Sequence, residues 1–300
     1  MAFSSLRSLM GASSGGGGNP YAIFGYGTTG SNSALTNKVD PSGIVATDTT
    51  GVGSARRYLA AAGYGSDKAL FGYGYTDSNS ALTNKVDSSG IVATDTTGVG
   101  SARRYLAAAG YGTDKAIFGY GTTGSYSSLT NKVDSSGNVA TDTTGVGSAR
   151  LALAAAGYGS NKALFGYGTT GSNSALTNKV DSSGNVSTDT TGVGTARYSL
   201  AAAGYGTNKA LFGYGSTGSY SSLTNKVDSS GTVSTDTTGV GTARDNLTAA
   251  GYGSDKAIFG YGTTGSNSAL TNKVDSSGTV STDTTGVGSA RYGLAAASYG

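Results

Sequence analysis

The sequence predicts an all-β protein, a six-bladed β-propeller built from four-stranded blades of 47 residues. Three observations lead to this prediction. One unit repeats six times, each unit contains short apolar segments separated by turn residues, and the two ends of the chain carry complementary parts of one unit. The repeat is marked by the phrase Phe-Gly-Tyr-Gly, which begins at Phe24, Phe71, Phe118, Phe165, Phe212 and Phe259.

One unit, residues 101–147, shows how the strands are expected to follow one another. Segments 106–111 and 116–120 are apolar or aromatic, and the Gly-Thr-Asp-Lys between them is typical of a turn, so they predict a hairpin. Segment 128–133 alternates apolar and polar residues. The phrase Asp-Ser-Ser-Gly then turns the chain into segment 138–143, which predicts a second hairpin. No segment repeats its apolar residues at the helical spacing of about 3.6 residues.

Four short antiparallel strands in a unit of this length match one propeller blade, and six blades lie within the usual range of about four to eight. The alternative is a β-solenoid, in which a unit this long would span about two coils. It is disfavoured because the two halves of the unit do not resemble each other. We therefore expect one propeller domain over residues 19–300. Its repeats begin near residues 19, 66, 113, 160, 207 and 254.

The repeat starts and stops inside a unit, and this predicts how the propeller closes. Segment 22–26 corresponds to the second strand of a blade, and segment 294–299 corresponds to the first strand. Pairing of the C-terminal strand with the N-terminal blade would remove the open edges that promote aggregation. The Ala-rich first strand is expected nearest the crowded central axis, because its side chains are small.

Three phrases of the repeat resemble the kelch repeat: Ser-Ala-Arg-x-x-Leu-Ala-Ala-Ala, Lys-Ala-Ile-Phe-Gly-Tyr-Gly and Leu-Thr-Asn-Lys-Val-Asp-Ser-Ser-Gly. In that family an Arg precedes a small-residue strand, a hydrophobic strand ends in paired glycines, and an aspartate turn follows. This sequence departs from the family because Tyr73 separates Gly72 from Gly74 and the usual Trp of the outer strand is absent. The second phrase also resembles tandem repeats of bacteriophage and bacterial surface proteins. The first resemblance implies a module that binds other proteins, and the second implies a virion or surface protein.

Charge and composition argue against several classes of function. The chain has 20 basic and 17 acidic residues, a net charge of +3 and no basic block, so nucleic acid is not an expected partner. It contains neither Cys nor His, which removes thiol chemistry, the commonest metal ligand and the usual general base. No apolar run reaches the ~20 residues needed to cross a bilayer, so we expect no membrane insertion. The first residues lack the continuous apolar stretch of a secretory signal, so any route to the exterior would be another one, such as release within a virus particle.

One arginine recurs in every unit at the entry to the Ala-rich strand. A propeller would place this set around one mouth of the central channel, where the guanidinium groups could grip an anion or a carboxylate. The alternative is a structural set of inter-blade ion pairs with aspartates that recur as regularly. The arginines are Arg56, Arg103, Arg150, Arg197, Arg244 and Arg291. The aspartates are Asp48, Asp95, Asp142, Asp189, Asp236 and Asp283.

The two positions after each of these arginines are the most variable in an otherwise near-uniform unit. In the expected topology they share a face with a second variable position, in the Thr-Thr-Gly-Ser loop, and loops on a rigid scaffold commonly carry binding residues. The Tyr, Arg, Asn and Asp side chains at these positions are therefore candidate binding residues, and the alternative is relaxed packing at an exposed rim. The candidates are Arg57, Tyr58, Arg104, Tyr105, Tyr126, Tyr198, Tyr220, Asp245, Asn246 and Tyr292.

The sequence offers little for catalysis or cofactor binding. Every repeated Asp occurs in equivalent surroundings, whereas an acid and a base need environments that differ. Asp77 and Asp245 break the repeat, and two isolated carboxylates make a weak case for a hydrolase. Gly-x-Gly sequences such as residues 51–53 have neither the following helix nor the spaced Lys of a phosphate-binding loop. We expect no enzymatic activity, no cofactor and no metal.

The first 18 residues precede the repeat. Phe3, Leu6, Leu9 and Met10 have rough helical spacing, and the Ser/Gly stretch that follows has the composition of a flexible tether. We expect residues 1–18 to attach the propeller to other subunits of a larger particle, such as a phage virion or tail. There its loop face would contact host-surface glycan or neighbouring subunits, at a virion or extracellular surface. The alternatives are a kelch-like intracellular module that binds a peptide in the cytoplasm and, last, a hydrolase.

Overall fold

The computed structural model describes residues 20–300, which form six antiparallel sheets of three strands each. Each sheet corresponds to one unit counted, like residues 101–147, from the Ser/Thr-Ala-Arg phrase, and the units are numbered by their sheets from here on. The first sheet takes its strands from both ends of the chain. The first sheet contains β18 (Ala295–Tyr299), β1 (Tyr21–Gly25) and β2 (Thr36–Val39). The second sheet contains β3 (Ala60–Tyr64), β4 (Lys68–Gly72) and β5 (Thr83–Val86), and the third contains β6 (Ala107–Tyr111), β7 (Lys115–Gly119) and β8 (Thr130–Val133). The fourth contains β9 (Ala154–Tyr158), β10 (Lys162–Gly166) and β11 (Thr177–Val180), the fifth β12 (Ala201–Tyr205), β13 (Lys209–Gly213) and β14 (Thr224–Val227), and the sixth β15 (Thr248–Tyr252), β16 (Lys256–Gly260) and β17 (Thr271–Val274).

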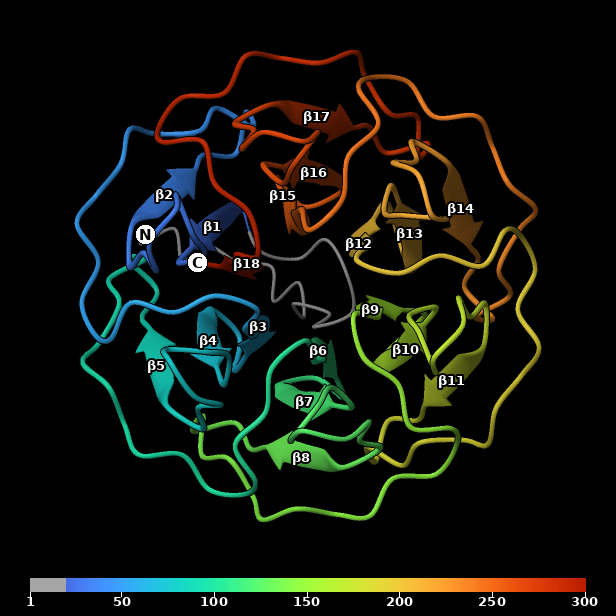
Figure 1. The fold of residues 1–300 in the computed structure, drawn as a ribbon, viewed down its shortest axis with the longest axis horizontal. Helices are drawn as coiled ribbons and strands as arrows, with labels where there is room; N and C mark the ends of the chain where they lie inside the picture. Colours follow the sequence, from blue (N-terminus) through green and yellow to red (C-terminus); the bar gives the residue numbers. More distant parts are fainter. Residues whose placement is uncertain (1–19) are drawn as a thin grey trace, which may run out of the picture.

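The C-terminal strand pairs with the N-terminal strand, as the sequence predicts. Strand β18 lies antiparallel to β1 with Phe24 opposite Ala296, and β1 also pairs with β2. The same register recurs in the third sheet, where Phe118 of β7 lies opposite Ala108 of β6 and Asn131 of β8. Figure 1 shows β1 and β18, the two ends of the described chain, side by side.

The predicted fourth strand of each unit is only partly formed. In the third unit the segment after the Asp-Ser-Ser-Gly turn meets β8 at two isolated bridges, Val139 opposite Val133 and Thr143 opposite Thr130. Between these bridges the outer segment has one residue more than β8. This is the geometry of a β-bulge, which interrupts the ladder of backbone hydrogen bonds. Each unit therefore has three strands and an irregular outer segment in place of the four strands predicted.

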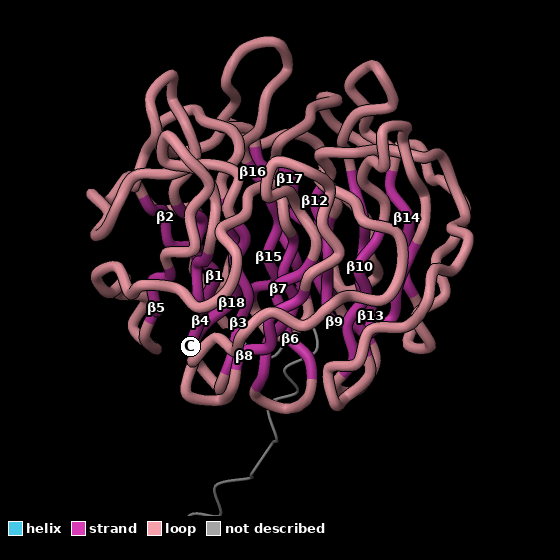
Figure 2. The backbone as a smooth tube through the Cα atoms, turned by 60° about the horizontal axis from the view of Figure 1, so that its bottom comes forward, coloured by secondary structure: helices cyan, strands magenta, loops and turns pink. Residues whose placement is uncertain are grey.

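The six sheets are arranged around a central axis (Figure 1). The Ala-rich strands β18, β3, β6, β9, β12 and β15 lie nearest this axis, and the other two strands of each sheet lie progressively farther out. Ala side chains from all six inner strands, including Ala108, Ala155 and Ala202, line a central channel. Figure 2, which is turned by 60° from Figure 1, shows loops beyond both ends of the strands.

The hydrophobic core lies between neighbouring sheets. At each interface the Phe of one Phe-Gly-Tyr-Gly phrase packs edge to face against the Tyr of the preceding unit, with ring centres 5.1–5.2 Å apart. Phe24 and Tyr261 join the first sheet to the sixth in the same way. Such a pair contributes about 0.5–1.5 kcal/mol beyond the burial of its area. Each unit therefore buries the Phe and Tyr of its Phe-Gly-Tyr-Gly phrase against its neighbours.

The first glycine of each phrase is required by this packing. A Cβ on Gly72 would lie 2.8 Å from Cζ of Phe118, closer than real side chains approach. Gly72 does not have a positive φ, so the requirement is for space and not for an unusual conformation. Gly25 has the same relation to Phe71. The repeated Phe-Gly pair thus sets the distance between neighbouring sheets.

Candidate functional site

The six repeated arginines form buried networks within their sheets. The side chain of Arg197 is fully buried, and its Nε donates a hydrogen bond to the carbonyl of Tyr214 over 3.0 Å. Its Nη2 donates to Oδ1 of Asn225 over 2.6 Å, and its Nη1 donates to Oδ1 of Asp236 over 3.3 Å. The guanidinium carbon lies 4.7 Å from the ring centre of Tyr167 in the preceding unit. The other five arginines are equally buried, and each forms an ion pair with the recurring aspartate of its own sheet.

The groups of this network shift one another's pKa. Burial lowers the pKa of Arg197, and the nearby Tyr167 and Asp236 offset only part of that change. Burial by itself would raise the pKa of Asp236, but hydrogen bonds from Thr195 and Asn225 and the charge of Arg197 outweigh it and lower this pKa. Burial raises the pKa of Tyr167 to about 12. The carboxylate is therefore held in its ionised form beside the guanidinium.

The arginines do not form the predicted ring around the channel mouth. None of the six lines the channel or its opening, because each side chain is directed to the Asn of the third strand and the Asp of the outer segment. The alternative prediction, ion pairs with the recurring aspartates, describes their contacts. It needs one correction, since each pair joins parts of one sheet and does not link two blades.

A continuous series of backbone hydrogen bonds surrounds the channel opening. The residue two positions after each buried arginine donates its N–H to the carbonyl of the equivalent residue in the preceding unit, over 2.6–2.9 Å. The series consists of Tyr58, Tyr105, Ala152, Ser199, Asn246 and Gly293, and it returns to its start because Tyr58 donates to Gly293. All six residues have φ between 50° and 63°. This left-handed conformation favours glycine and asparagine.

Side chains of the first three sheets gather on one side of this opening. They are named the Arg–Tyr cluster and comprise Arg57, Tyr58, Tyr75, Arg104, Tyr105 and Tyr292. The guanidinium carbons of Arg57 and Arg104 lie 5.1 and 4.6 Å from the ring centre of Tyr75. The rings of Tyr58 and Tyr105 stack with their centres 4.0 Å apart and an interplanar angle of 27°. The cluster therefore joins two cationic groups to a pair of stacked aromatic rings and to the ring of Tyr75.

Backbone and side-chain contacts hold the cluster in place. Arg57 and Tyr75 exchange two backbone hydrogen bonds, of 3.1 and 2.8 Å, which continue the pairing of β3 with β4. Nη1 of Arg57 donates to Oδ1 of Asn32 over 3.0 Å, and Nη1 of Arg104 donates to Oδ1 of Asn79 over 3.4 Å. Both Asn residues occupy the second variable position of their units. The two variable positions predicted to share a face are thus in direct contact here.

The two arginines of the cluster have no acidic partner. All ion pairs within residues 20–300 involve other Lys and Arg residues. Nε of Arg57 is buried and has no hydrogen-bond partner. Burial raises the pKa of Tyr58 to about 12, so its hydroxyl is neutral at physiological pH. Two guanidinium groups therefore contact one tyrosine ring with no carboxylate bonded to either of them.

The structure brings together half of the candidate binding residues. Arg57, Tyr58, Arg104, Tyr105 and Tyr292 belong to the Arg–Tyr cluster. The others, Tyr126, Tyr198, Tyr220, Asp245 and Asn246, belong to the third, fifth and sixth units. No ring contact, ion pair or side-chain hydrogen bond within the described residues joins these five to the cluster. The side chains of Tyr126 and Tyr220 are 44% and 43% exposed on separate loops.

Tyr75 is the member of the cluster that sequence reasoning missed. It follows β4 in the second sheet and contacts both arginines. The five equivalent positions hold Thr or Ser, namely Thr28, Thr122, Thr169, Ser216 and Thr263. The same comparison of repeats that identified the other candidates would have found it.

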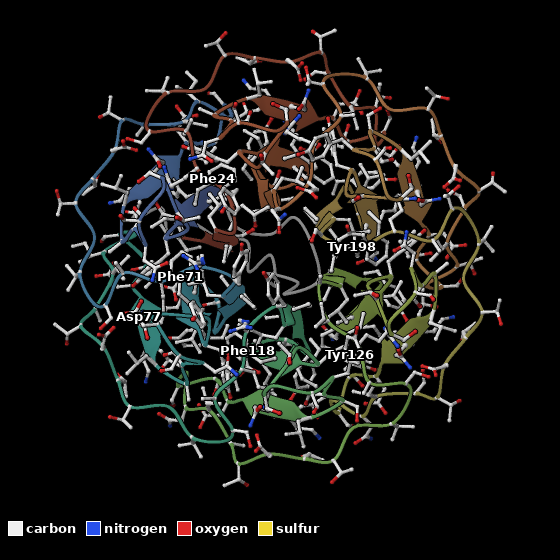
Figure 3. The ribbon with its side chains drawn as sticks, viewed as in Figure 1. Phe24, Phe71, Asp77, Phe118, Tyr126 and Tyr198 are labelled. Carbon is white, nitrogen blue, oxygen red and sulfur yellow. The ribbon has the colours of Figure 1, made fainter. Side chains whose placement is uncertain are left out.

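The two carboxylates considered for catalysis lie in different sheets. Asp77 is exposed in the loop after β4, and Figure 3 places it farther from the central axis than Tyr198. Asp245 belongs to the sixth unit and is only 9% exposed. Burial raises the pKa of Asp245, while Nδ2 of Asn246 donates to its Oδ1 over 2.9 Å. Within residues 20–300, His, Cys, Asp and Glu side chains form no group of three that could hold a metal ion.

Comparison with known proteins assigns no family to the chain. No protein-family model matches it, and no curated protein matches it. The resemblance of the repeat to kelch therefore stays a prediction. In the part of the chain that the structure describes, residues 20–300, no helix is long and apolar enough to cross a membrane.

Proposed function

We propose that the chain is a closed six-bladed β-propeller that acts as a non-enzymatic binding module, with the Arg–Tyr cluster as its contact surface. Two sets of contacts support the propeller, because both continue from the sixth unit to the first. One is the series of backbone hydrogen bonds around the channel opening, and the other is the set of Phe–Tyr pairs between sheets. A rigid scaffold of this kind holds the residues of its loops in fixed positions.

The observation that carries the binding role is that six large non-repeating side chains, those of the Arg–Tyr cluster, are grouped in one sector. The positions equivalent to Arg57 and Tyr58 hold only Leu151 and Ala152 in the fourth unit. Relaxed packing at a rim would leave such side chains without mutual contacts. In the cluster they are joined by ring stacking at 4.0 Å and by guanidinium contacts with one ring. Tyr and Arg are also enriched among the residues that dominate binding energy at interfaces.

We further propose that the propeller belongs to a larger particle, such as a phage virion or tail, and contacts host-surface glycan or neighbouring subunits. The support is in the sequence. The Ser/Gly stretch suits a tether, and the repeat phrase resembles those of phage and bacterial surface proteins. Residues 1–18, the proposed attachment segment, lie outside the described residues. The proposed location is a virion or extracellular surface.

A glycan array probed with the full chain tests the binding role. We expect binding by the natural sequence and loss of the array signal in Tyr58→Asn, which introduces the residue found at the equivalent position of the sixth unit. The matched control is Tyr21→Lys, which introduces the residue present in the other five units at a position outside the cluster. Absence of binding to every glycan would contradict this role and indicate a purely structural part.

The intracellular alternative draws support from the same cationic cluster, which would also suit acidic side chains of a peptide. Co-purification of one defined cellular protein would favour it, whereas finding the chain in purified particles would exclude it. The hydrolase alternative has the least support, because Asp77 and Asp245 lie in different sheets and Asp77 is exposed on a loop.

A further inference from the structure

We propose that the Arg–Tyr cluster binds a carboxylated sugar, with Arg57 and Arg104 holding the carboxylate and the stacked rings of Tyr58 and Tyr105 contacting the sugar ring. This inference rests on the binding role proposed above and specifies the ligand. It predicts that the same surface discriminates strongly between acidic and neutral glycans.

The charge balance of the cluster is the first support. Each of the six buried arginines has its own aspartate, at 3.2–3.7 Å. Arg57 and Arg104 have none, although both guanidinium carbons lie within 5.1 Å of the same ring centre. Two like charges gathered in one cluster without an acidic partner repel each other. An anion bound beside both of them would remove this repulsion.

The hydrogen-bonding capacity of the two arginines is the second support. A guanidinium group has five N–H donors in a planar fork that matches a carboxylate. Arg57 uses Nη1 for Asn32, and Arg104 makes one long contact of 3.4 Å with Asn79. Within the described residues no other side-chain hydrogen bond is made by either guanidinium. Both groups thus keep donors for an incoming acid.

The aromatic surface explains why the anion is assigned to a sugar. The guanidinium carbons of Arg57 and Arg104 lie 5.5 and 5.8 Å from the ring centres of Tyr58 and Tyr105. A pyranose ring is small enough to lie on these tyrosines while its carboxylate reaches the arginines. Tyr58 and Tyr105 also line the shallow depression at the channel opening, next to Ala152 and Ser199. Such a depression suits a compact ring better than an extended peptide.

The repeat gives a further reason to treat the cluster as one site. Tyr75 stands where the other units have Thr or Ser, and the second and third units alone carry Arg followed by Tyr at the variable pair. These changes lie in different loops, and they meet only in the folded chain. Their joint presence is explained by one ligand that contacts all of them.

Isothermal titration of the full chain tests this inference. The probes are trigalacturonate, 3′-sialyllactose and their neutral counterparts, trigalactose and lactose, with hexaglutamate as the peptide probe. We expect at least one acidic sugar to bind about tenfold or more tightly than its neutral counterpart, since hydrogen bonds to charged groups are the strong ones. The affinity should fall with added salt.

Variants assign the effect to the cluster. Arg57→Gln and Arg104→Gln should each weaken acidic-sugar binding about tenfold or more, because each removes a charged donor. Tyr75→Thr, which restores the residue of the other units, should weaken it several-fold. The matched control is Lys115→Gln, which removes the same charge from an exposed position at the start of β7 and should bind normally. A urea denaturation curve for each variant shows that it is folded.

The possible failures are distinguishable. Equal binding of acidic and neutral sugars, unchanged by either Arg substitution, would overturn the inference and leave the proposed glycan-binding role standing. Binding of hexaglutamate with no sugar binding would overturn both in favour of the peptide-binding alternative. No binding of any probe by the folded chain would also overturn the inference.

Discussion

The backbone around the channel opening imposes one conformation on six residues that tolerate it differently. Gly293 adopts a positive φ without steric cost, whereas Ser199, with φ of 52°, has a Cβ that disfavours it by about 1–2 kcal/mol. We expect Ser199→Gly to raise the free energy of unfolding by about 1 kcal/mol, measured by urea denaturation. Gly293→Ala should lower it by at least as much, because its Cβ would lie 2.9 Å from Cδ1 of Tyr58. If Ser199→Gly is destabilising, the strain assigned to this position is absent.

Individual residues also show what the sequence could reveal about the site. Departures from the repeat are visible in the sequence, and for this reason Arg57 and Arg104 could be identified as candidates. Their partner Tyr75 carried the same signal. The burial of Arg197 and its equivalents could not be predicted from departures from the repeat, because these arginines are present in every unit. Their burial depends on where the Asp of the outer segment lies. That position is set by a bulge, which leaves no distinct pattern in the residues.

Among the elements, the outer segment combines an irregular backbone with an aspartate that accepts several hydrogen bonds. In the third unit, Oδ2 of Asp142 accepts hydrogen bonds from the backbone N–H and the hydroxyl of Ser101, over 2.9 and 2.6 Å. Its Oδ1 accepts from Asn131 over 2.8 Å and from Arg103 over 3.2 Å. The segment therefore ties the loop that enters a sheet to the third strand of the same sheet. Its side chains replace part of the missing backbone ladder.

Removal of this carboxylate should be costly. Asp142→Ala leaves the guanidinium of Arg103 buried without its partner, and breaking such a pair costs about 3–5 kcal/mol. We expect a loss near the lower end of this range, because the Asp142 side chain is 24% exposed. The control is Asp67→Ala, which breaks an exposed pair with Lys68 and should change stability by less than about 1 kcal/mol. Equal effects of the two substitutions in urea denaturation would contradict the role of the outer segment.

The elements themselves were largely predictable from local patterns. The segments predicted at residues 106–111 and 116–120 correspond to β6 and β7 within one residue at each end, and the predicted segment 128–133 contains β8. Apolar alternation and turn residues determine these strands. The prediction of a fourth strand was wrong. Nothing in the residues of that segment indicates the extra residue between its two bridges with β8.

In the whole molecule, the junction between the sixth sheet and the first has the same contacts as the other junctions. Phe24 packs against Tyr261, and Nζ of Lys273 donates to the carbonyl of Ser42 over 2.9 Å, as the equivalent lysines do between consecutive units. Open repeat arrays need special terminal units because their end repeats lack a neighbour. In the closed propeller proposed above, each of the six units has two neighbours. The six buried Arg–Asp networks are therefore expected to unfold in one cooperative transition.

Acid should weaken the molecule through these six networks together. In each, burial by itself would raise the pKa of the aspartate, but hydrogen bonds and the neighbouring Arg outweigh it and lower the pKa. An aspartate whose pKa is lower in the folded state than its unfolded value of about 3.9 stabilises the fold. This stabilisation is fully present above the unfolded pKa and is lost as the pH falls through the folded pKa. Asp245 has the opposite sign, since burial raises its pKa, but it is a single group. The chain has no His, so we expect the free energy of unfolding to be nearly constant between about pH 5 and 8 and to drop steeply below about pH 4. Urea denaturation at a series of pH values measures this dependence of the free energy of unfolding on pH. A free energy of unfolding that stays constant down to pH ~3 would show that the six carboxylates do not stabilise the folded state.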